Sequence, residues 1–102
     1  MSVLAELSIF PTDQGESVGD FVAPVVQLIR DSGLTCQLTA MGTILETERL
    51  SDALDVLEQA EALLRQRGCK RVYATLKLDI RDGPMGRLAG KVRSVENRLR
   101  DV

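Results

Sequence analysis

Ten residues from Val72 to Arg81 constrain the fold of this chain more than any other stretch. Apolar and polar side chains alternate there without a break, the apolar ones being Val72, Ala74, Leu76, Leu78 and Ile80. Alternation with period two over this length is typical of a β-strand with one buried face, so we expect the apolar face to pack on a core. The polar face is either a plain solvated surface or, if neighbouring strands extend it, a binding surface.

Composition narrows the class of protein. The 102 residues fit one domain, 1–102, and the 44% hydrophobic content is ordinary for a globular fold. We expect no signal peptide and no membrane span, and therefore a cytoplasmic protein. The net charge of −2, with both signs interspersed, argues against nucleic acid as a partner. The absence of histidine removes the commonest general base and the commonest metal ligand.

The beginning of the chain predicts a second alternating strand over residues 3–10, followed by a helix. Ser17 with Asp20 three residues later resembles a capping box at the start of that helix. Pro24 leaves two possibilities open: the helix starts near Asp20 with Pro24 in its first turn, or the helix is kinked.

Two short apolar runs between residues 34 and 47 predict a β-hairpin. With Met41-Gly42 as its turn, Leu38 lies opposite Leu45, and both face the core.

Two more helices are indicated around the long strand. Ser51 is a good N-cap for a helix that runs to Arg67. The last helix has a narrow apolar stripe at helical spacing, formed by Leu88, Val92, Val95 and Leu99.

The resulting order, βαββαβ plus a C-terminal helix, predicts an α+β ferredoxin-like sandwich with the antiparallel strand order 4-1-3-2. Both helices between the strands then cover one face. The other face mixes apolar Leu4, Phe10 and Ile44 with polar residues, and we interpret it as a subunit interface that encloses a polar cavity. Its polar residues are Glu6, Ser8, Thr39, Glu46, Thr75, Lys77 and Asp79.

Three segments carry a resemblance to a known family. They are Ala5-Glu6-Leu7-Ser8, Met41-Gly42-Thr43-Ile44-Leu45-Glu46, and the strand Val72-Tyr73-Ala74-Thr75-Leu76-Lys77-Leu78-Asp79-Ile80-Arg81. In this order and spacing they resemble the small thiamine-binding proteins of ferredoxin-like fold, over essentially the whole chain. Two departures are Ala40, where many members have proline, and Ile80, where many have aspartate.

The resemblance implies a protein that binds thiamine or its hydroxymethylpyrimidine moiety and does not catalyse a reaction. It also implies a homotetramer, a dimer of dimers, with ligand sites at subunit contacts. No cofactor or metal is expected besides this ligand.

The chemistry of the candidate residues is compatible with such a ligand. Glu6 or Glu46 can oppose the thiazolium cation or bind the aminopyrimidine edge, because charge-assisted hydrogen bonds are strong. Gly42 allows close backbone approach, and the Met41 thioether adapts to a flat ring. The full candidate set is Glu6, Ser8, Thr39, Met41, Gly42, Thr43, Glu46, Thr75, Lys77 and Asp79.

Several alternatives stay open. Glu6 and Lys77 can instead form a structural ion pair as cross-strand neighbours, and Met41-Gly42 can be a plain hairpin turn. A regulatory domain that senses another small metabolite is the closest rival function. Catalysis is disfavoured because Ser8 and the two cysteines have no histidine partner. Cys36 and Cys69 fall beside opposite edges of the predicted sheet, so we expect two free thiols.

Overall fold

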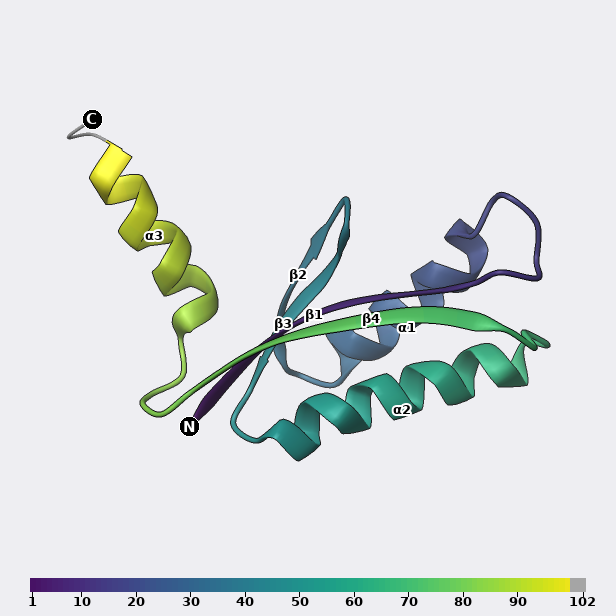
Figure 1. Ribbon diagram of the computed structural model, residues 1–102, viewed down its shortest axis with the longest axis horizontal. Helices are drawn as coiled ribbons and strands as arrows, with labels where there is room; N and C mark the ends of the chain where they lie inside the picture. Colours follow the sequence, from purple (N-terminus) through teal and green to yellow (C-terminus); the bar gives the residue numbers. More distant parts are fainter. Residues whose placement is uncertain (100–102) are drawn as a thin grey trace.

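The computed structural model describes residues 1–99, and the elements follow the order βαββαβα (Figure 1). They are β1 (Ser2–Pro11), α1 (Gly19–Asp31), β2 (Thr35–Thr39), β3 (Gly42–Thr47), α2 (Leu50–Gln66), β4 (Val72–Arg81) and α3 (Arg87–Leu99). Every strand and helix expected from the sequence is present, and β4 has the predicted bounds.

The four strands form one antiparallel sheet in the order β2-β3-β1-β4. This confirms the predicted order 4-1-3-2 and the ferredoxin-like architecture. β1 and β4 pair along their whole length, from Ser2 opposite Arg81 to Pro11 opposite Val72. The two alternating strands therefore present matched faces, and β2 and β4 are the edges of the sheet.

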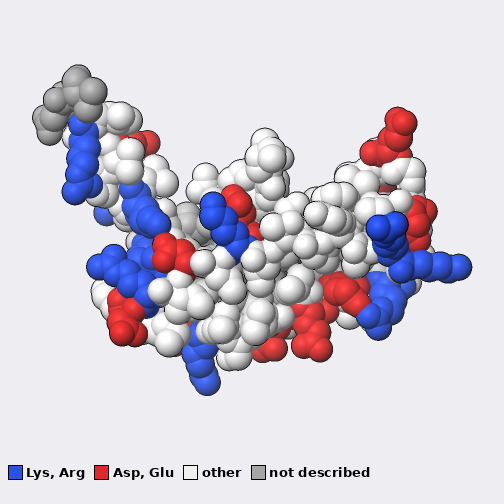
Figure 2. Space-filling view, in the orientation of Figure 1, with Lys and Arg blue, Asp and Glu red and all other residues white. Residues whose placement is uncertain are grey.

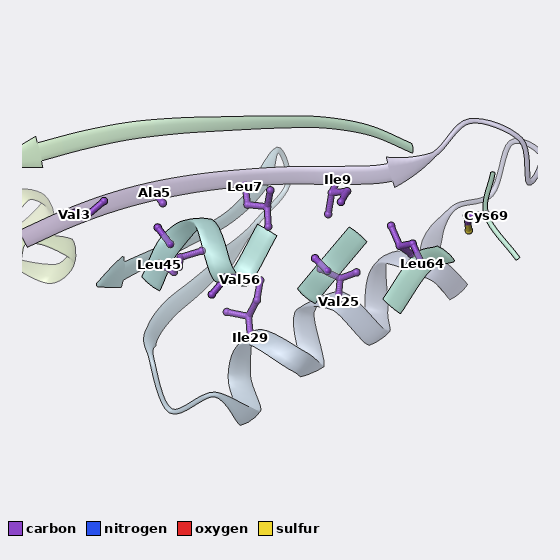
Figure 3. Packing of buried hydrophobic residues seen from close by; sticks show 12 residues of the cluster. Val3, Ala5, Leu7, Ile9, Val25, Ile29, Leu45, Val56, Leu64 and Cys69 are labelled. Carbon is purple, nitrogen blue, oxygen red and sulfur yellow. The ribbon is translucent and has the colours of Figure 1, made fainter. Parts of the chain in front are cut away.

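The hydrophobic core lies between one face of the sheet and the helices α1 and α2 (Figure 1, Figure 3). Alternate side chains of β1 point toward the helices, where they are joined by the buried hydrophobic residue Leu45 of β3. Burial of apolar side chains in this layer is the main source of stability. The central members are Val3, Ala5, Leu7, Ile9, Val25, Ile29, Leu45, Val56, Ala60 and Leu64.

Both predicted helix caps are wrong. In α1 the cap position is Val18, without a side-chain hydrogen bond, and Pro24 lies inside the helix rather than in its first turn. In α2 the cap is Arg49, with extended backbone, so Ser51 falls inside the first turn. Local sequence marks a helix start only within a residue or two, because the packing of the helix decides where it begins.

The hairpin has a different register from the one predicted. The turn is Ala40-Met41, and Leu38 lies opposite Thr43 instead of Leu45. The shift is two residues, so every side chain stays on its predicted face. Leu38 is 51% exposed all the same, because it lies near the tip of the hairpin.

The apolar face of β4 is only partly covered, contrary to expectation. Val72 and Leu76 are half-buried against the core. Ala74 is exposed, Leu78 is 36% exposed and Ile80 is 49% exposed. The single chain therefore leaves an apolar strip along its longest edge strand.

α3 stands on the side of the sheet opposite α1 and α2 (Figure 1). Its predicted apolar stripe is mostly exposed, with Val92, Val95 and Leu99 between 51% and 62% accessible. Across residues 1–99, every helix falls short of the length and hydrophobicity that a membrane span requires. Cys36 on β2 and Cys69 before β4 are both free thiols, as predicted.

Candidate functional site

The sheet face turned away from α1 and α2, which we call the open face, carries most of the predicted ligand residues. On it Glu6 lies opposite Lys77 of β4 and Ile44 of β3, while Ser8 lies opposite Thr75. The predicted adjacency of Glu6 and Lys77 is confirmed. Within residues 1–99, however, their charged groups make no ion pair within 4.0 Å, so the structural ion pair is not formed.

A hollow of about 230 Å³ lies on the open face. Leu4 and Ile44, both half-buried, give it an apolar floor between the strands. Charged side chains of both signs surround that floor, and they come from three different elements, β1, β4 and α3. These are Glu6, Lys77, Asp79 and Lys91. The hollow therefore offers an apolar surface for a flat ring and charges for a polar edge.

Asp79 is held by two cations of α3. Its Oδ2 lies 3.0 Å from Nη1 of Arg87 and 2.9 Å from Nζ of Lys91. The hydrogen bond from Lys91 lowers the pKa of Asp79; partial desolvation opposes this, and the bond and charge of Arg87 add to the lowering. Asp79 thus remains ionised, and its charge is largely offset within the chain.

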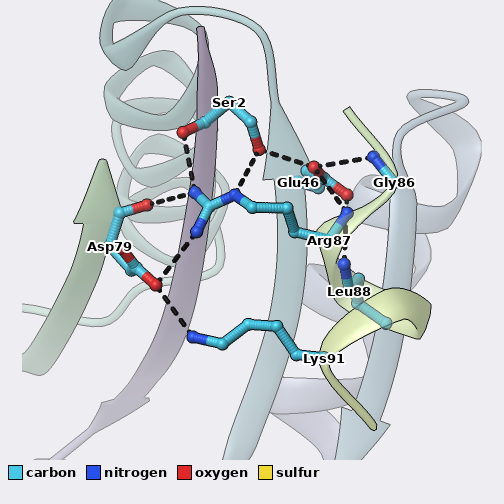
Figure 4. A network of polar contacts seen from close by, with 7 residues as sticks. All are labelled: Ser2, Glu46, Asp79, Gly86, Arg87, Leu88 and Lys91. Carbon is cyan, nitrogen blue, oxygen red and sulfur yellow. Dashed lines mark hydrogen bonds and ion pairs between the residues drawn. The ribbon is translucent and has the colours of Figure 1, made fainter. Parts of the chain in front are cut away.

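Glu46 is buried on the open face beneath the start of α3 (Figure 4). Its Oε2 accepts hydrogen bonds from the Ser2 hydroxyl at 2.6 Å and from the backbone N–H groups of Gly86 and Arg87 at 3.0 and 3.2 Å. Its Oε1 accepts the N–H of Leu88 at 3.3 Å. A carboxylate in this position satisfies the unpaired N–H groups of the first helical turn and complements the helix dipole.

The pKa of Glu46 reflects two opposing effects. Burial alone would raise it, but the hydrogen bonds from the Ser2 hydroxyl and from the backbone of Arg87, Leu88 and Gly86 together lower it. The carboxylate is therefore charged, and both of its oxygens accept hydrogen bonds from the backbone at the start of α3. Its predicted ligand role stays a prediction, since the side chain already accepts four hydrogen bonds.

Arg87 completes this network by joining three elements (Figure 4). Its Nε donates to the Ser2 hydroxyl at 3.0 Å, and its Nη2 donates to the backbone carbonyls of Ser2 and Asp79, both at 2.8 Å. The planar guanidinium can hold β1, β4 and α3 together because its donors have fixed directions.

The hairpin residues form a second, separate group. The Thr39 hydroxyl donates to the carbonyl of Gly42 at 2.8 Å and accepts the N–H of Met41 at 3.2 Å, so it closes the turn. Met41 is 80% exposed, and Thr43 is buried opposite Leu7 on the core side of the sheet. These residues line a narrower hollow of about 180 Å³ between the hairpin and α1.

The predicted set is thus divided between the two hollows. Glu6, Lys77 and Asp79 meet at the open-face hollow, whereas Ser8 and the hairpin residues line the other one. Glu46 and Thr75 line neither of the two. Sequence reasoning missed Lys91 and Arg87, which reach the open face from α3. Their spacing of four residues places both on one side of a helix, and this spacing could have identified them from the sequence. Nothing in the sequence marks Ser2 as part of this site, because its burial depends on α3.

The chain matches known proteins over most of its length. The family model described as thiamine-binding protein matches residues 5–96. A UPF0045 protein of Mycobacterium bovis is 36% identical over 99 residues, covering 97% of this chain and 96% of that protein. Another, from Methanothermobacter thermautotrophicus, is 32% identical over 98 residues and covers 95% and 99%.

Solved structures share the fold. A protein of Methanocaldococcus jannaschii superposes with a TM-score of 0.81 at 28% identity, covering 93% of this chain and 96% of the other. A Thermotoga maritima protein, described as a candidate thiamine biosynthesis or salvage protein, gives a TM-score of 0.79 at 18% identity and covers 93% and 99%. With the family model matched across nearly all described residues, this chain belongs to the thiamine-binding protein family.

Proposed function

We propose that this protein binds thiamine or its hydroxymethylpyrimidine moiety, without chemical conversion, in the open-face hollow. The observation that carries the proposal is the match of the thiamine-binding family model to residues 5–96, which include every side chain of that hollow except Leu4. The Thermotoga maritima neighbour adds an association with thiamine metabolism for a protein of the same fold.

The charges of the hollow suit a ligand with a cationic ring and an aminopyrimidine. Asp79 is neutralised by Arg87 and Lys91, whereas Glu6 makes no ion pair within residues 1–99. The Glu6 carboxylate is therefore the group available to oppose a thiazolium or accept from an amino group. Leu4 and Ile44 supply the apolar area on which a ring can lie.

Binding without catalysis is the simpler role for these side chains. The sequence contains no histidine, and the Ser8 hydroxyl lies opposite the neutral Thr75 rather than beside a base. A serine without an adjacent general base is a weak nucleophile.

The size of the hollow supports a site completed by another subunit. Small-molecule sites usually enclose about 300–1,000 Å³, and the open-face hollow holds about 230 Å³. We propose a homotetramer, a dimer of dimers, in which subunit contacts deepen this hollow around the ligand. Tyr73, which is 60% exposed on the open face, and the exposed apolar residues of α3 favour such contacts.

Calorimetric titration of the purified protein with thiamine, hydroxymethylpyrimidine and thiamine diphosphate tests the ligand. Saturable binding of thiamine or the pyrimidine supports the proposal. Heat changes no larger than those of dilution for all three compounds would contradict it and would favour a sensor of another metabolite.

A further inference from the structure

A second hollow of ligand size lies between the loop of residues 82–86 and one side of α3, and we call it the α3 hollow. Its volume is about 500 Å³, within the range of about 300–1,000 Å³ that is usual for small-molecule sites. The end of β4 contributes Arg81 to its lining, and α3 contributes residues from Arg87 to Val95. Only Lys91 lines both this hollow and the open-face hollow. The α3 hollow is therefore a separate candidate site.

One part of its lining is apolar and uncovered. Met85 is 40% exposed and Val95 is 57% exposed, and Pro84 lies beside them in the lining. Small-molecule sites usually combine such apolar area with a few polar groups that fix the orientation of the ligand. The apolar side chains can therefore receive the hydrocarbon part of a bound molecule.

The charged part of the lining is mainly basic. Arg81, Arg87 and Lys91 line the hollow together with a single acidic residue, Asp82. In Figure 2, Lys and Arg side chains predominate along α3 and around its base. A cationic ligand would be repelled by the three basic groups, so the charge of the hollow favours an anion.

Arg81 is the basic residue with its side chain available. Arg87 and Lys91 are both paired with Asp79, whereas Arg81 is exposed and makes no ion pair within residues 1–99. A guanidinium can donate two parallel hydrogen bonds to the oxygens of an anion. Lys91 can add a further bond, because its ammonium has three donors and the bond to Asp79 uses one of them.

The backbone at the start of α3 is not available for an anion. The N–H groups of Gly86, Arg87 and Leu88 already donate to the carboxylate of Glu46. An anion in the α3 hollow therefore has to be held by side chains.

Gly90 gives an independent indication of a ligand. It lies inside α3 and lines the hollow, although glycine destabilises the interior of a helix relative to alanine. A Cβ built on Gly90 would have no atom within 4 Å, so the packing of the chain does not require glycine there. The missing side chain leaves the surface of the helix open to a molecule in the hollow.

We propose that the α3 hollow binds a phosphate monoester. Its phosphate is held by Arg81 with help from Lys91, and its apolar part lies on Met85 and Val95 beside Gly90. This inference goes beyond the proposed function, because the open-face hollow is assigned to a cationic ring and the α3 hollow to an anion.

Titration with phenyl phosphate, followed by NMR of the ¹⁵N-labelled protein, tests the site. Saturable shifts are expected for the amide signals of Gly83 and Gly90. Benzylamine carries a similar ring with a positive charge and should leave both signals in place. Inorganic phosphate should bind about five-fold or more weakly than phenyl phosphate, because it has no apolar surface to bury.

Two variants separate a binding role from a structural one. Arg81→Gln should weaken phenyl phosphate binding about ten-fold or more, since a charged hydrogen bond is lost. Arg71→Gln is the matched control, because Arg71 is exposed and precedes the opposite end of β4. Gly90→Ala should also weaken binding while it raises the free energy of unfolding, which a general defect of the fold would lower.

Three results would overturn the proposal. They are the absence of saturable shifts with phenyl phosphate, equal affinity for inorganic phosphate, and wild-type affinity of Arg81→Gln. A protein that gives any of these results but binds thiamine in calorimetric titration would keep the proposed function.

Discussion

The Ser2 hydroxyl donates a 2.6 Å hydrogen bond to Oε2 of Glu46, 44 positions away in the sequence. The same carboxylate oxygen accepts the N–H groups of Gly86 and Arg87. One buried charge therefore joins β1 and β3 to the first turn of α3. Because α3 has no buried residue of its own in the described chain, its position depends on these polar bonds more than on packing.

Replacing the carboxylate should loosen this junction. We expect Glu46→Gln to reduce the free energy of unfolding by about 1–3 kcal/mol, because hydrogen bonds to a charged group are lost at a buried position. Urea unfolding followed by circular dichroism measures the change. Glu48→Gln is the control, since Glu48 is exposed and accepts no side-chain hydrogen bond within residues 1–99. Equal stability of the wild type and Glu46→Gln would show that the network contributes little.

Stability should also depend on pH through Glu46. Folding lowers the pKa of this carboxyl from its ordinary value of 4.5, so the unfolded chain binds the proton more tightly. The stabilisation is complete above about pH 4.5 and is lost as the pH falls through the lower pKa of the folded state. Folding also lowers the pKa of Asp79, so this carboxylate contributes to the same loss of stability at low pH. Urea unfolding between pH 3 and 6 should show a steeper loss in the wild type than in Glu46→Gln; parallel curves would contradict this assignment.

Replacing each of two glycines with alanine should change the free energy of unfolding in opposite directions. At Gly42, with φ of +157°, an added Cβ would lie 2.8 Å from the carbonyl oxygen of Leu7. We expect Gly42→Ala to lower the free energy of unfolding by about 1–3 kcal/mol, the range typical of overpacking. Gly90 lies within α3 with open space around its Cα, so Gly90→Ala should raise it by about 0.5–1 kcal/mol. Thermal or urea unfolding of both variants checks the contrast, and a Gly42→Ala protein as stable as the wild type would refute it.

The strands were predictable because their signal is local. Alternation with period two identifies β4 and its face without knowledge of the rest of the chain. The hairpin shows the limit of this signal. Its faces were correct and its partners were wrong by two residues, because a shift of two preserves the alternation. The actual turn depends on the Thr39 hydroxyl bonding across to Gly42, which is a specific contact rather than a pattern.

The candidate site was predictable only as a set of residues on one sheet face. Glu6 and Lys77 were expected to be neighbours, and their register confirms it. The role of Glu46 could not be predicted, because it depends on the loop after β4 returning the chain to the open face. The alternation of β4 likewise gave no warning that Ile80 would be exposed, since a pattern does not show how far a helix covers a strand.

The dissociation constant of thiamine for Glu6→Gln, compared with the wild type by calorimetric titration, tests most directly whether the open-face hollow is the ligand site. Loss of a charged hydrogen bond of about 1–3 kcal/mol corresponds to affinity weakened roughly five- to 150-fold. Glu48→Gln should bind like the wild type, and sedimentation should show that both variants keep the native assembly. If Glu6→Gln binds thiamine as tightly as the wild type, the ligand does not use this carboxylate, and the open-face site is wrong.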